Sequence, residues 1–64
     1  MIYPRERPTA VGGAKLQHHL YFDTMDDFPD LPGLDRVARG SDAFCVDTGE
    51  AYILRGDNGE WEEL

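Results

Sequence analysis

Two neighbouring histidines are the residues that most directly suggest chemistry. His18 and His19 could bind a metal ion, but they lie in the run LQHHLYF, residues 16–22, which has the composition of a β-strand. Adjacent side chains of a strand point to opposite faces, so these two imidazoles cannot hold one metal ion together. We therefore expect one exposed and one packed histidine, and neither a metal site nor a cofactor.

The acidic side chains of residues 23–30 are a second candidate. Asp23, Asp26, Asp27 and Asp30 could offer oxygen ligands to calcium, but their spacing does not match the alternating ligands of a calcium-binding loop. A solvated acidic loop, or one that meets a basic patch on a partner, fits better than paired catalytic carboxylates. Cys45 lies in the middle of a predicted strand, where a desolvated thiol is inert. We therefore do not expect an enzyme.

Length and charge restrict the classes of function further. A chain of 64 residues forms one domain with a thin core, and its single cysteine excludes an internal disulfide. Because a thin core without a disulfide needs another source of stability, we expect self-association or docking onto a larger partner. The net charge of −7 argues against nucleic acid as the main ligand. The absence of a long apolar run predicts a soluble protein made in the cytosol, with no membrane partner.

Residues 1–15 form a segment of different character. Pro4, Pro8 and the pair Gly12-Gly13 interrupt both helices and paired strands, which predicts an extended N-terminal arm ahead of a small β domain at 16–64. A disordered tail is the alternative. We expect the arm to contact a partner protein, with Ile2 and Tyr3 filling a pocket and Arg5 and Arg7 meeting acidic groups.

The rest of the chain predicts a mostly β fold, a small antiparallel meander. Three C-terminal strands are expected at 43–47, 51–55 and 60–64, after one earlier strand at 16–22. Thr24 could cap a single turn through Asp27, ended by Pro29 and Pro32. Thr48-Gly49 and Asn58-Gly59 are turn signals, and two-residue loops there give a definite register. The predicted cross-strand pairs are Cys45 with Tyr52, Phe44 with Ile53, Val46 with Ala51, Arg55 with Glu62, Ile53 with Leu64 and Gly56 with Trp61.

That register gives the sheet two apolar faces. One carries Phe44, Val46, Ala51, Ile53 and Leu64, and the other carries Ala43, Cys45, Tyr52, Leu54 and Trp61. Strand 16–22 and the segment at 28–34 can cover one face, so the other needs a partner. We expect Tyr52, Leu54 and Trp61 to take part in partner binding, the two aromatic rings either as anchors of a protein contact or as a stacking surface for a sugar. The alternative is that they form the core of the domain.

Residues 40–64 form a pattern of short strands and turns: Gly40-Ser41, a strand, Thr48-Gly49, a strand with an aromatic residue, a turn, and Trp61 near the end, with Leu31-Pro32 ahead of it. This pattern resembles that of small proteins of tailed bacteriophages. Proteins of this kind are virion accessory parts, such as head decoration proteins, head fibre bases or tail components. The resemblance implies a structural protein of the virion that binds the major coat protein or another virion protein, in repeated or self-associated copies.

Two other functions are open at this point. The acidic body also fits a small phage inhibitor that mimics nucleic acid and blocks a host defence protein. The aromatic pair also fits a sugar-binding module of a tail or receptor-binding assembly. Both alternatives, like the first, act by binding and use no cofactor.

Overall fold

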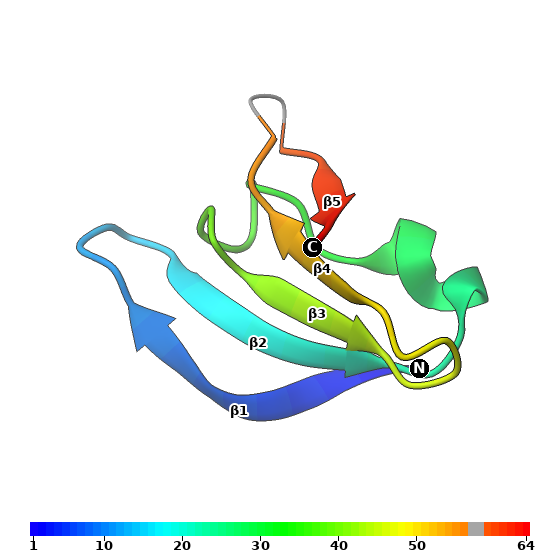
Figure 1. Ribbon diagram of the computed structural model, residues 1–64. Coiled ribbons are helices and arrows are strands. Elements are labelled where there is room, and N and C mark those ends of the chain that lie inside the picture. Colours follow the sequence, from blue (N-terminus) through cyan, green and yellow to red (C-terminus); the bar gives the residue numbers. More distant parts are fainter. Residues whose placement is uncertain (57–58) are drawn as a thin grey trace.

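A single five-stranded sheet forms the body of the protein (Figure 1). The computed structural model describes residues 1–56 and 59–64. The strands are β1 (Ile2–Ala10), β2 (Leu16–Phe22), β3 (Asp42–Cys45), β4 (Ala51–Leu54) and β5 (Trp61–Glu63), and they lie side by side in chain order. The prediction of a mostly β fold is confirmed. The sheet is mixed, because β2 and β3 run parallel while the other neighbours are antiparallel.

The N-terminal segment is an edge strand and not a free arm. Residues 2–10 pair with β2, with Ile2 opposite Phe22 and Ala10 opposite Leu16. Pro4 and Pro8 are tolerated because an edge strand leaves one side of its backbone unpaired. The pairing shifts register on both sides of Glu6, which accommodates the prolines. The expectation that prolines prevent strand pairing here was therefore wrong, although the segment is extended as expected.

The parallel pairing of β2 with β3 forces the chain to cross over the sheet. Residues 23–41 make this crossover and include a short 3-10 helix, η1 (Met25–Asp30). The predicted turn after Thr24 is present, but the Thr24 side chain makes no capping hydrogen bond, and Pro29 lies inside the helix instead of ending it. Figure 1 shows the crossover in green, displaced to one side of the sheet.

The core lies between the crossover and one face of the sheet. Phe22, Ala43, Cys45 and Leu54 are fully buried, and Leu20 and Tyr52 are nearly so. Leu31 packs with this cluster from the crossover, where Val37 is also buried, and Phe28 packs its ring 5.0 Å from that of Tyr52. The sequence predicted that the strand at 16–22 would cover one face of the sheet. This prediction was wrong, because β2 is itself a strand of the sheet, between β1 and β3.

A buried serine closes the crossover at the start of β3. Ser41 donates from Oγ to the carbonyl oxygen of Ala38 at 2.7 Å, and its Oγ accepts the backbone N–H of His18 at 2.9 Å. Gly40, with a φ of +95° that favours glycine, turns the chain into the strand. The Gly40-Ser41 pair therefore has a structural role, since it joins the end of the crossover to β2.

The observed register differs from the predicted one by two residues in both hairpins. Ala43 lies opposite Tyr52 and Phe44 opposite Ala51, because the first loop spans residues 46–49 and not Thr48-Gly49 alone. Leu54 lies opposite Trp61, so Trp61 does not cover Gly56 as predicted. Asn58 of the second predicted turn lies outside the described residues. A shift of two residues keeps every side chain on its face, so the predicted division into two faces survives.

The covered face gives the first test of this packing. Leu54 is completely buried between the sheet and the crossover, so Leu54→Ala should lower the free energy of unfolding by about 2–5 kcal/mol. Val11→Ala, in the exposed loop after β1, should change it by less than about 0.5 kcal/mol. Chemical denaturation of both variants measures the two effects, and similar losses for the pair would contradict the assigned core.

Candidate functional site

An aromatic row crosses the face of the sheet that the crossover leaves open. Tyr3 on β1, Tyr21 on β2 and Phe44 on β3 are side by side, because Tyr3 pairs with Tyr21 and Tyr21 pairs with Phe44. The first two ring centroids are 5.5 Å apart with a tilt of 48°, and the next two are 6.1 Å apart at 76°. These are ordinary aromatic packing geometries, so the three rings form one continuous apolar ridge.

The same row continues across the rest of the sheet. Ala51 pairs with Phe44, and the N–H of Leu64 donates to the carbonyl oxygen of Ala51 at 2.9 Å. Ile53 and Val46 flank the row on the same face. Leu64 is 68% exposed and Val46 is 51% exposed, whereas the other members of the surface are half-buried: Tyr3, Tyr21, Phe44, Ala51 and Ile53. We call this surface, made by Tyr3, Tyr21, Phe44, Val46, Ala51, Ile53 and Leu64, the open face.

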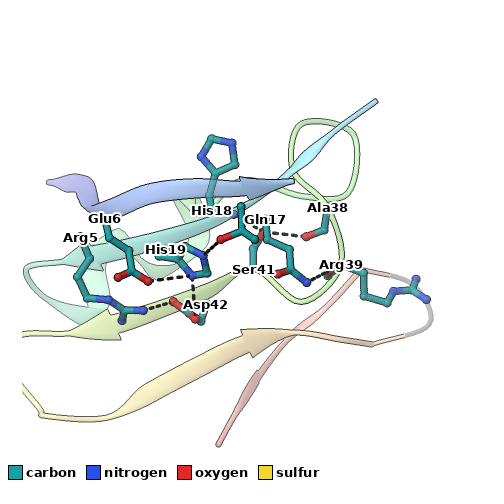
Figure 2. A network of polar contacts seen from close by, with 10 residues as sticks. Arg5, Glu6, Gln17, His18, His19, Ala38, Arg39, Ser41 and Asp42 are labelled. Atoms are coloured by element: carbon teal, nitrogen blue, oxygen red, sulfur yellow. Dashed lines mark hydrogen bonds and ion pairs between the residues drawn. The ribbon is translucent and has the colours of Figure 1, made fainter. Parts of the chain in front are cut away.

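A polar network, shown in Figure 2, lies two residues further along the strands than the aromatic row. Arg5 on β1 donates to Asp42 on β3 at 2.5 Å, and its guanidinium carbon lies 5.9 Å from the centre of the Tyr21 ring. His19 on β2 lies between β1 and β3, with Nδ1 at 3.1 Å from Oδ2 of Asp42 and Nε2 at 2.8 Å from Oγ1 of Thr9. The network therefore joins three strands through charge-assisted contacts.

The order carboxylate, imidazole, hydroxyl resembles the arrangement that activates a hydroxyl nucleophile. Here the Thr9 hydroxyl lies at the exposed edge strand, and the described part of the chain forms no pocket that could hold a substrate beside it. Glu6 also approaches Nδ1 of His19, at 3.9 Å. The arrangement is best explained as a cross-strand tie that holds β1 in the sheet.

The two histidines point in opposite directions, as the strand pattern predicted. Figure 2 shows His18 turned away from the network that surrounds His19. Among residues 1–56 and 59–64, no group of three or more His, Cys, Asp or Glu side chains is arranged to hold a metal ion. No helix in the same residues is long and apolar enough to span a bilayer.

The amino terminus anchors the other end of β1. The Met1 ammonium group forms one ion pair with Asp27 in η1 and a second with Asp23, at a distance of 3.3 Å. These carboxylates raise the pKa of the amino group above its usual value, and the hydrogen bond from the ammonium group lowers the pKa of Asp27. Burial, together with Asp23, raises the pKa of the Tyr3 hydroxyl. Two of the four clustered aspartates thus hold the strand that carries Tyr3 and Arg5.

The residues predicted for partner binding fall into separate places. Tyr3 and Arg5 lie on the open face, as a contact surface requires. Arg7 is exposed on β1, and Ile2 packs against the core of its own chain.

Two of the three C-terminal residues predicted to bind a partner, Tyr52 and Leu54, are not available for contact because they are buried. Tyr52 and Leu54 are buried in the core, and Trp61 packs against it with Nε1 donating to the carbonyl oxygen of Pro32 at 3.0 Å. These side chains are covered because the crossover lies over them. They belong to the domain's own core, and the aromatic surface left for a partner is the opposite one.

The sequence reasoning assigned no role to Tyr21 or Asp42, and it weighed His19 only as a metal ligand. Their shared signal was available: Gln17, His19 and Tyr21 alternate along one strand, and Asp42 and Phe44 alternate along another. These residues of β2 and β3 become neighbours because the two strands pair in parallel. No local sequence pattern predicts that pairing. Comparisons of the chain with protein-family models, curated proteins and solved structures gave no match.

The polar network predicts a clear difference between two of its members. Asp42→Ala removes the partner of both Arg5 and His19, so it should lower the free energy of unfolding by about 1–2 kcal/mol. Thr9→Val removes one exposed hydrogen bond and should cost less than about 1 kcal/mol. Equal effects in urea denaturation would contradict the central position of Asp42.

The anchor of β1 predicts a pH dependence. A lowered pKa at Asp27 stabilises the fold above the ordinary carboxyl pKa of 3.8 and is lost as the pH falls. A raised pKa of the amino group stabilises it below the ordinary value of 8.0 and is lost as the pH rises through the folded-state pKa. The ion pair should therefore stabilise the fold most between about pH 4 and pH 8.

Asp27→Asn tests this window. The variant should lose stability relative to the parent at pH 6 and converge with it at pH 2.5, whereas Asp30→Asn in the same helix should follow the parent throughout. Denaturation midpoints across the pH range measure the difference. A constant offset of Asp27→Asn at every pH would show that the carboxylate acts by packing and not by charge.

Proposed function

We propose that this chain is a non-enzymatic structural protein that works by protein–protein contact, as an accessory part of a tailed-phage particle. The observation that carries the contact is the open face, an aromatic row on a sheet whose other face already has its core. Apolar patches on the surface of small domains are typical of interaction sites, and this one combines half-buried aromatic rings with two exposed side chains, Val46 and Leu64. The virion setting rests on the resemblance of residues 40–64 to phage accessory proteins.

Support for protein contact comes from the composition of the open face. Two tyrosines and a phenylalanine form its centre, and an arginine held by Asp42 borders them. Aromatic residues and arginine are the residue types enriched at the energetic centres of protein interfaces. The ion pair and the Tyr21 ring restrict the Arg5 side chain before binding, which reduces the entropy that a contact would cost.

The sugar-binding alternative loses its basis. It relied on Tyr52 and Trp61 as a shared stacking surface, and both rings pack into the core. The rings that remain on the open face are tilted against one another by 48° and 76°, so they do not form a flat platform for a sugar. The acidic-inhibitor alternative makes a different prediction in the experiment below.

Mass spectrometry of gradient-purified particles tests the virion role. Particles made from the genome that encodes the chain should contain it in many copies per particle. A chain that is abundant in the lysate but missing from purified particles would contradict the proposal and favour an inhibitor of a host protein.

Attachment by purified protein tests the contact surface. Particles assembled without the chain should bind the added parent protein, and Tyr21→Ser should weaken this binding about tenfold or more, since truncating a central aromatic anchor typically costs at least 2 kcal/mol. Asp35→Ser, on the crossover side, is the control and should bind like the parent. Unchanged binding of Tyr21→Ser would show that the open face is not the contact surface.

A further inference from the structure

β1 is packed against the core less than the three strands that follow it. Each of its nine residues is exposed or half-buried, whereas β2, β3 and β4 each place two side chains in the buried core. From β1, Ile2 packs against the edge of the core cluster. Burial of apolar surface is the main source of folding stability, so β1 gains less of it than its neighbours in the sheet.

The backbone pairing of β1 is also interrupted. Its register against β2 shifts on both sides of Glu6, whereas β2 and β3 pair at four successive positions without a shift. Pro4 and Pro8 have no N–H group to donate. Each shift disrupts the ladder locally, so the backbone holds β1 less firmly than it would hold a regular strand of the same length.

Charged contacts supply part of what the core and the ladder do not. The Met1 ammonium group pairs with Asp23 and Asp27, and Arg5 pairs with Asp42. Residues 1–15 hold three basic side chains and one acid, a net charge of +2, whereas residues 16–64 hold three arginines and twelve acids, a net charge of −9. Ion pairs at a protein surface contribute little individually and are screened by salt. The docking of β1 therefore depends on attraction that is weak and sensitive to salt.

The connection from β1 to β2 has the properties of a hinge. Residues 11–15 belong to neither strand and contain Gly12, with a φ of +85°, and Gly13. A Cβ atom added at either glycine would meet no described atom within 4 Å beyond the adjoining residues. Rotation at these two glycines can therefore swing β1 away from β2 without disturbing the packing elsewhere.

We infer that β1 is a releasable strap with a charged latch. It separates from β2 as one unit, by rotation at Gly12 and Gly13, while β2 to β5 and the crossover keep their structure. Release takes Tyr3 away from Tyr21, so the strap determines whether the aromatic row of the open face is complete. This property goes beyond the proposed function and is independent of the partner that the open face contacts.

Two backbone amides distinguish release from unfolding. The Phe22 carbonyl oxygen accepts the N–H of Val46 at 2.9 Å, so the backbone groups of Phe22 face the β3 side. Successive residues of a strand point these groups to opposite neighbours, so the Tyr21 N–H faces β1 and is freed by release. The Cys45 N–H donates to the Glu50 carbonyl oxygen at 2.8 Å in the β3–β4 hairpin, and it is freed only when the body unfolds.

Native-state hydrogen exchange of the full chain, followed by NMR, measures both amides. After correction for intrinsic rates, Tyr21 should exchange about tenfold faster than Cys45 or more, with a weaker dependence on urea, because release exposes less surface than unfolding. Raising NaCl from about 20 mM to about 500 mM should increase this ratio. Equal protection with equal urea dependence would show that β1 leaves only on unfolding, and a ratio unchanged by salt would refute the charged latch.

A core substitution separates the strap from the body. Leu54→Ala weakens the body, which stays folded during release, so it should speed exchange at Cys45 about thirtyfold or more and leave Tyr21 within about twofold of the parent. Ala43→Gly, a milder change on β3, gives the same comparison if Leu54→Ala does not fold. Acceleration of both amides by one factor would overturn the inference.

A pair of arginine substitutions tests the latch. Arg5→Ala removes a contact that is broken in both the released and the unfolded states, so it should speed exchange of Tyr21 and Cys45 alike, by about tenfold. Arg7→Ala, which removes an exposed arginine from the same strand, is the matched control and should leave both rates within about twofold of the parent. Equal effects of the two substitutions would refute the latch.

Discussion

The parallel pairing of β2 with β3 is the constraint on which the rest of the structure depends. Two neighbouring parallel strands cannot be joined by a tight turn, so residues 23–41 must pass over the sheet. In doing so they bring Leu31 into one cluster with Phe22 and Tyr52 and complete the hydrophobic core of the described residues. The described residues of this 64-residue chain contain one such crossover segment. It covers one face of the sheet and leaves the other face open.

The open face is then divided by the strand register into an apolar and a polar row. The apolar row begins with Tyr3 and ends with Leu64, and the polar row centres on His19. The polar row holds β1 in the sheet. The pairing of β1 is weakened by its two prolines and its shifted register. By fixing β1 at the amino terminus and again at Arg5, the fold keeps Tyr3 beside Tyr21. The polar network thus contributes to the contact surface by position, not by chemistry of its own.

Local patterns in the sequence were sufficient to predict the division of the sheet into two faces and some of its contacts. Alternation along residues 43–46 and 51–54 sorted the side chains into the correct two faces, because an error of two residues in each loop leaves the faces unchanged. The opposite directions of His18 and His19 followed from the same rule. Arg55 and Glu62 also make the predicted contact, although the residue directly opposite Glu62 is Ile53.

The remaining features depend on contacts between distant parts of the chain. Both faces of the meander are apolar, so nothing local shows that the crossover covers Tyr52 and Leu54 and leaves Phe44 and Ile53 open. For this reason Tyr52 and Leu54, predicted to bind a partner, are buried, and Trp61 is half-buried against the same core. In residues 2–10 the prolines masked a strand, since their effect depends on whether the strand lies at an edge, which is a property of the whole sheet.

We propose that Tyr21 and Phe44 are covered by another protein when the molecule acts, whereas Tyr52 is already buried within its own chain. Hydroxyl-radical footprinting, with mass spectrometric readout, measures this for each ring in the dilute chain and in its assembled state. The account predicts that Tyr52 is protected in both states, and that Tyr21 and Phe44 are oxidised in the dilute chain and protected on assembly. Equal reactivity of Tyr21 and Phe44 in both states, or a reactive Tyr52 in the dilute chain, would contradict it.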